Sequence, residues 1–98
     1  MRLSKRIIKI LQENIVKSFG NVNVYLFGSR LDDTKKGGDI DLAIDTHLSK
    51  EEFRRKKAQF LALLMRIDFD YQIDVVNFNT KDQLLHNEIQ KQHYKLAL

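Results

Sequence analysis

Asp39 and Asp41 are the two residues whose type and spacing first point to chemistry. Side chains alternate between the faces of a strand, so a strand over residues 39–45 places both carboxylates on one face and Ile40, Leu42 and Ile44 on the other. Hard divalent cations prefer oxygen ligands, and two carboxylates on one face supply half of such a ligand set. An isolated Asp-x-Asp is also common in solvated turns. Here, however, it lies within an otherwise apolar run, which favours a metal site.

A third acid, Asp74, lies between aliphatic residues in a run over 71–78 that is typical of a strand. Burying a carboxylate in such a strand costs about several kcal/mol of stability unless the carboxylate is paired, hydrogen-bonded or bound to a metal. The pattern therefore predicts a buried Asp74 that has a partner.

A glycine–serine turn follows the first apolar strand, predicted over residues 22–27. Gly28 allows the backbone to turn sharply and to approach a ligand closely. Ser29 would begin a short helical turn, where free N–H groups favour a phosphate and the hydroxyl adds a donor. A polar loop ending in Gly37 and Gly38 then leads to the Asp-x-Asp strand.

The order Gly28-Ser29, nine residues, Asp39-x-Asp41 resembles the nucleotidyltransferase superfamily that shares the DNA polymerase β palm. Within it, the chain is most similar to minimal nucleotidyltransferases, which are often antitoxins paired with an all-helical HEPN toxin. Residues 85–91 resemble the closing segment of that family, so the resemblance covers nearly the whole chain.

The resemblance implies roles for six residues. The pair Gly28-Ser29 would hold the terminal phosphates of the nucleotide, and Arg30 would add a basic phosphate contact. Asp39, Asp41 and Asp74 would form a catalytic carboxylate triad that binds two Mg²⁺ ions, with ATP as the substrate.

The expected fold class is α/β (α+β), a minimal nucleotidyltransferase fold in one domain over residues 1–98. It would have a mixed sheet of three or more strands with its helices packed on one face. Apolar residues at three- and four-residue spacing predict helices, two of which follow capping boxes at 49–52 and 80–83. Gly20 provides a stop for the first helix. The expected helices span 4–19, 50–67 and 81–93, and the expected strands span 22–27, 39–45 and 71–78.

The composition is that of a globular protein and argues against a membrane protein. The chain is 43% hydrophobic and 31% charged, as in ordinary globular proteins, and its formal charge of +4 suits a polyphosphate ligand or an acidic partner. It has no cysteine, no apolar run long enough for a membrane span and no signal-peptide pattern, so we expect a cytoplasmic protein without a membrane partner. The three histidines lack the spacing of metal ligands.

The basic run over residues 54–57 raises the question of nucleic-acid binding. Four consecutive residues wrap around most of a helical turn and do not form one flat face, so a solvated surface is favoured over direct nucleic-acid binding.

These observations lead to one functional hypothesis. A free-standing catalytic palm would take its acceptor from a partner. The resemblance implies an antitoxin that transfers AMP from ATP to a tyrosine of a HEPN RNase toxin and neutralises it. Two alternatives are a non-catalytic antitoxin that acts by binding its toxin, and a nucleotidyltransferase that acts on RNA or a small molecule.

Overall fold

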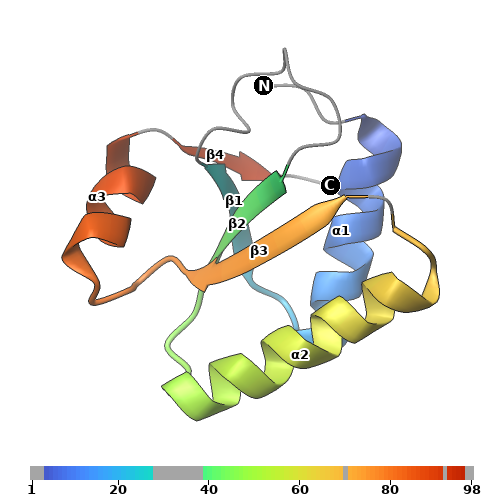
Figure 1. Ribbon diagram of the computed structural model, residues 1–98, viewed down its shortest axis with the longest axis horizontal. Coiled ribbons are helices and arrows are strands. Elements are labelled where there is room, and N and C mark those ends of the chain that lie inside the picture. Colours follow the sequence, from blue (N-terminus) through green and yellow to red (C-terminus); the bar gives the residue numbers. More distant parts are fainter. Residues whose placement is uncertain (1–3, 28–38, 70, 92, 97–98) are drawn as a thin grey trace.

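The computed structural model describes residues 4–27, 39–69, 71–91 and 93–96. Figure 1 shows that their strands form one sheet, with the helices around it. In chain order these elements are α1 (Lys5–Ser18), β1 (Asn23–Phe27), β2 (Asp39–Asp45), α2 (Lys50–Arg66), β3 (Gln72–Asn77), α3 (Gln83–Lys91) and β4 (His93–Leu96).

The described strands form one mixed sheet in the order β3-β2-β1-β4. β1 runs antiparallel to both β2 and β4, whereas β2 and β3 are parallel and are connected through α2. The crossover through α2 is needed because parallel neighbours cannot be joined by a tight turn. It brings two segments that are distant in the sequence side by side at the edge of the sheet (Figure 1). The mixed α/β fold is confirmed.

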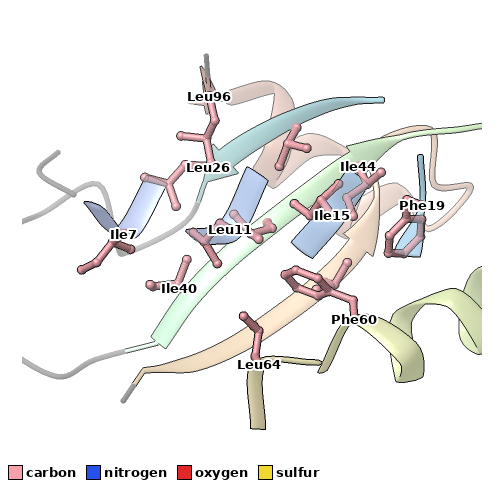
Figure 2. Close-up of a cluster of buried hydrophobic side chains, with 13 residues drawn as sticks. Ile7, Leu11, Ile15, Phe19, Leu26, Ile40, Ile44, Phe60, Leu64 and Leu96 are labelled. Atoms are coloured by element: carbon pink, nitrogen blue, oxygen red, sulfur yellow. The ribbon is translucent and has the colours of Figure 1, made fainter. Parts of the chain in front are cut away.

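The main core lies between one face of the sheet and the helices α1 and α2. Figure 2 shows it from close by. Helical spacing directs the apolar residues of each helix to one side, and strand alternation directs every second residue of β2 to meet them. The buried members of this core are Ile7, Leu11, Ile15, Phe19, Val24, Leu26, Ile40, Leu42, Ile44, Phe60, Leu64, Val75 and Leu96.

The third helix departs from the expected one-sided packing. Ile89 of α3 is fully buried and packs with Phe27 and Ala43, and Leu85 lies against the same small cluster. Ala43 occupies the face of β2 opposite to Leu42 and Ile44, so α3 covers the other side of the sheet. The expectation that the helices pack on one face holds for α1 and α2 and is wrong for α3, because the chain offers apolar residues on both faces.

The helix ends show which polar groups satisfy the first and last turns. Ser4 and Ser49 cap α1 and α2 by accepting hydrogen bonds from the N–H groups of Ile7 and Glu52. Gly20 has φ +87°, a left-handed conformation that suits glycine after the end of α1. The predicted cap at Ser49 and the stop at Gly20 are confirmed, and the structure adds the cap at Ser4.

At α3 the capping residue differs from the prediction. The side chain of Asp82 accepts from the N–H groups of Leu84 and Leu85 at 3.1 and 3.2 Å, whereas Thr80 only accepts from the N–H of Asp82 at 3.1 Å. The cap is therefore Asp82. The capping box predicted at 80–83 is wrong, because the aspartate next to the helix already reaches its free N–H groups.

The C-terminal segment is the largest departure from the expected elements. The helix predicted over 81–93 ends at Lys91, and residues 93–96 form β4 beside β1. The strand places Leu96 in the main core, and the Gln12 side-chain amide donates to the backbone oxygen of Leu96 at 3.0 Å. Pairing with β4 also satisfies backbone groups of β1 that would otherwise form an open sheet edge.

Candidate active site

Asp41 and Asp74 are brought together by the register of β2 and β3. They are direct partners across the parallel pair, and neighbouring strands lie about 4.8 Å apart. Leu42 and Val75, the next residues of each strand, are both buried in the main core. Because side chains alternate, both aspartates lie on the face away from α1 and α2.

Asp39 is the first residue of β2 and shares the strand parity of Asp41, two positions away. Its Cα partner on β3 is Gln72. The side chain of Asp39 lies outside the described part of the chain. The convergence of all three carboxylates therefore stays a prediction, and what the structure describes of Asp39 is its backbone at the beginning of β2.

Gly28, Ser29 and Arg30 also lie outside the described residues, so their role stays a prediction. The ends of the segment that contains them are described. Phe27, the last residue of β1, pairs with Asp41 across the antiparallel strands, and β2 begins at Asp39. The Gly-Ser pair thus follows directly after the residue that faces Asp41.

The environments of the two described carboxylates differ. Asp41 belongs to the interior strand β2 and is half-buried, whereas the side chain of Asp74 is 61% exposed on the edge strand β3. The prediction that Asp74 is a buried acid is wrong, because β3 is an edge strand of the sheet that the described strands form. Its position opposite Asp41, rather than the cost of burying it, is what connects Asp74 to a site.

Sequence reasoning missed one residue of this site, Lys57. Its Nζ atom lies 3.4 Å from Oδ1 of Asp74, and the lysine reaches there from α2. The spacing of Phe53, Lys57, Phe60 and Leu64 contained the signal, because it places Lys57 on the inward stripe of the helix. The ammonium group supplies positive charge beside Asp74, at the carboxylate that would otherwise bind a metal cation.

The fourth acid of this region, Asp45, has a structural partner. The Asn79 side-chain amide donates to Oδ1 of Asp45 at 2.7 Å and to the backbone oxygen of Thr46 at 3.2 Å. Between Asp45 and Asp41, the same face of β2 carries Ala43, which is buried in the α3 cluster. The candidate site therefore occupies the beginning of β2 and does not extend along the whole strand.

The donor chemistry fits a hard divalent cation. Two carboxylates in register on adjacent strands present oxygen ligands only, which is the preference of Mg²⁺. Among the residues whose side chains are described, no group of three His, Cys, Asp or Glu residues is arranged to hold a metal ion. Asp39 is not among those residues, so the described part of the site is a pair of carboxylates.

No helix of the described residues combines the length and apolar character needed to cross a membrane.

Comparison with known proteins yields a family match. The model of the family described as "Polymerase beta, Nucleotidyltransferase" matches residues 5–97. A search of curated protein sequences found no match.

Among the solved structures with a similar fold are several toxin–antitoxin complexes. A toxin–antitoxin structure with AMP-PNP has a TM-score of 0.66 at 20% identity, covering 92% of this chain and 72% of that chain. A MntA–HepT toxin–antitoxin structure has a TM-score of 0.53 at 24% identity, covering 94% of this chain and 67% of that one. The complex of a tri-AMPylated HEPN toxin from Shewanella oneidensis with its MNT antitoxin has a TM-score of 0.52 at 25% identity, covering 94% and 66%.

Proposed function

This chain belongs to the polymerase β nucleotidyltransferase family, and on that premise we propose that it is a Mg²⁺-dependent antitoxin that transfers AMP from ATP to a tyrosine of a HEPN toxin. The observation that carries the proposal is the pairing of Asp41 with Asp74 across β2 and β3, on the face of the sheet opposite the main core. The likeness to a complex with an AMPylated HEPN toxin supports the choice of acceptor.

Two Mg²⁺ ions, when bound to Asp39, Asp41 and Asp74, would neutralise charge on the triphosphate and lower the pKa of the attacking hydroxyl. Asp39 and Asp41 share a strand and would hold the ion that arrives with ATP. Asp74, on the neighbouring strand, would serve the ion beside the acceptor. Its exposure at the sheet edge leaves room for a tyrosine from another protein.

In the proposed transfer, the tyrosine oxygen forms a bond to the α-phosphorus of ATP and the bond from that phosphorus to the bridging oxygen of pyrophosphate breaks. The phenolic proton passes to the carboxylate of Asp74, and pyrophosphate leaves. Gly28 and Ser29, aided by Arg30, would hold the β- and γ-phosphates through backbone N–H groups, the hydroxyl and the guanidinium. Positioning and charge stabilisation thus supply most of the catalysis.

The test uses the purified chain, its genomically adjacent HEPN partner, Mg²⁺ and ATP labelled at the α-phosphate. We expect label on the toxin, at a tyrosine identified by mass spectrometry, together with loss of its RNase activity. An Asp41→Asn variant should form the complex and leave the toxin unlabelled.

Two other outcomes would select the alternatives. A toxin that is bound and inhibited but unlabelled by the native chain would establish an antitoxin that acts by binding alone. Label on RNA or on a small molecule in place of the toxin would assign a different acceptor.

A further inference from the structure

Three cations form a row on one side of α2. Lys50, Arg54 and Lys57 follow one another at spacings of four and three residues, which places them on one face of a helix. All three line a single hollow of about 270 Å³. The basic run 54–57 is thus divided. Arg54 and Lys57 face this hollow, and Arg55 and Lys56 line a separate one of about 110 Å³.

The other described residues that line the hollow are uncharged. Leu48 and Phe53 provide apolar surface, and the ring of Phe53 is held in place by that of Phe19, with 5.3 Å between the ring centroids. Asn77 contributes from the end of β3. Its Oδ1 accepts from the N–H of Asn79 at 2.9 Å, so the NH₂ group is the part of this amide that stays a donor.

The hollow has an excess of positive charge. None of the described residues that line it is an acid. Among the described residues, one of its three cations is paired with a carboxylate: Lys57 contacts Asp74. Lys50 and Arg54 lie near the N-terminus of α2, the positive end of the helix dipole. Glu51 and Glu52 share that first turn, but neither lines the hollow. An anion bound here would relieve repulsion among these groups.

We propose that this hollow, with Lys50, Arg54, Lys57 and the amide of Asn77, is a second anion site that takes a phosphoryl group carried by a small molecule. Its volume suits a group smaller than the ligands of typical pockets of roughly 300–1,000 Å³. A second hollow of about 520 Å³ shares Leu48, Lys50 and Asn77 and is lined further by Lys81, so it offers space for the rest of the molecule.

Lys57 connects this anion site to the candidate active site, a step that rests on the proposed function. Its ammonium lines the hollow and also contacts Asp74 at 3.4 Å. An anion in the hollow draws the ammonium from Asp74 and leaves that carboxylate available to Mg²⁺. The coupling is reciprocal, so Mg²⁺ at Asp74 strengthens anion binding by the same factor.

Anion binding is tested with AMP and inorganic phosphate, titrated without Mg²⁺ and followed by calorimetry and by the side-chain NMR signal of Asn77. We expect saturable binding that shifts this signal, and AMP should bind more tightly than phosphate if the larger hollow holds the nucleoside. Arg54→Ala should weaken binding about tenfold, the effect of losing one charge-assisted hydrogen bond. Arg55→Ala, the same change at the next position, should leave it unchanged. Equal losses in the two variants, or an Asn77 signal that does not move, would overturn the proposal.

The coupling is tested by measuring Mg²⁺ affinity with and without saturating sulfate, an isostere of phosphate that binds Mg²⁺ weakly. Sulfate should raise the affinity about fivefold or more in the native chain and have no effect in Lys57→Met, which keeps the stem without the charge. Sulfate binding without this rise would refute the role of Lys57. Anion binding that persists in a chain unable to label any toxin would refute the proposed transfer and leave the second site standing.

Discussion

At the scale of the residue, Asp74 lies at an exposed position that costs little stability, but directly opposite another carboxylate that repels it. An exposed carboxylate on an edge strand needs no partner for stability, and its ion pair with Lys57 is of the surface kind that contributes about 0–1 kcal/mol. Stability therefore does not explain why an acid stands directly opposite Asp41. Two carboxylates side by side repel each other, so their pairing favours a functional role.

Asp74→Asn should separate binding from transfer. The proposed role of Asp74 is to hold the ion beside the acceptor, so its loss removes stabilisation felt chiefly in the transition state. We expect Mg-ATP affinity within a few-fold of the native value by calorimetry, and a fall of orders of magnitude in AMP transfer to the toxin. The variant should still form the complex with its partner.

Asp68→Asn is the matched control for this prediction. Asp68 is also an exposed aspartate, and its φ of 52° is a left-handed conformation that asparagine tolerates well. It lies just beyond the end of α2 and belongs to neither β2 nor β3, so the change should leave transfer intact. Native transfer rates in Asp74→Asn would show that the third carboxylate is assigned to the wrong residue.

At the scale of the element, most helices and strands could be predicted and the C-terminal one could not. β2 has the predicted bounds 39–45, and α1 and α2 differ from the prediction by a residue at their ends, because long amphipathic patterns are specific. Leu85, Ile89, His93 and Leu96 continue a helical spacing past the end of α3, so local pattern favours helix. The edge of β1 that β4 covers is a property of the assembled sheet, which no local pattern contains.

Leu96→Ala tests the strand at this position. Leu96 is 5% exposed in the main core, and truncating such a leucine typically costs about 2–5 kcal/mol. Lys95→Ala is the control, since Lys95 is exposed and points the other way, and it should change stability by less than about 0.5 kcal/mol. Denaturant unfolding of both variants measures the difference. Equal small effects would count against β4 as part of the core.

Asp82 is predicted to hold the beginning of α3. Asp82→Ala removes the acceptor of two helix N–H groups and should lower the free energy of unfolding by about 1 kcal/mol. Asp82→Asn keeps a capping oxygen and should retain most of the native stability. Thr80→Val should have a small effect if Asp82 is the cap. Chemical denaturation of the three variants measures these effects, and a larger loss of stability in Thr80→Val than in Asp82→Ala would contradict the assignment.

At the scale of the whole molecule, the candidate site could be predicted in part because its residues lie in a motif. The spacing of Asp39 and Asp41 predicted two acids on one face of a strand, and the register of β2 with β3 places Asp41 opposite Asp74. Lys57 could not be found in this way, because its contact with Asp74 depends on how α2 crosses from β2 to β3. The assignments of Gly28, Ser29 and Arg30 stay predictions.

The whole-molecule prediction concerns stabilisation by Mg-ATP. A ligand that binds only the folded state at a hundredfold excess over its dissociation constant adds about 2.7 kcal/mol, which shifts the Tm of a chain this size by roughly 10–20 °C. Asp41→Asn should lose most of this shift, because Asp41 is proposed to hold the ion that arrives with the triphosphate. The same change should raise the Tm of the ligand-free chain slightly, since it removes one of two facing carboxylates.

ATP with EDTA is the control for this measurement and should give only the smaller shift expected from the metal-independent anion site, because ligation by Asp41 and Asp74 depends on the metal. A native chain whose Tm does not respond to Mg-ATP, while it still binds and inhibits its toxin, would indicate that the paired carboxylates no longer hold a metal. The antitoxin would then act by binding alone. A shift that survives in Asp41→Asn would instead place the nucleotide elsewhere, and the basic hollow beside Lys57 is the first place to look for it.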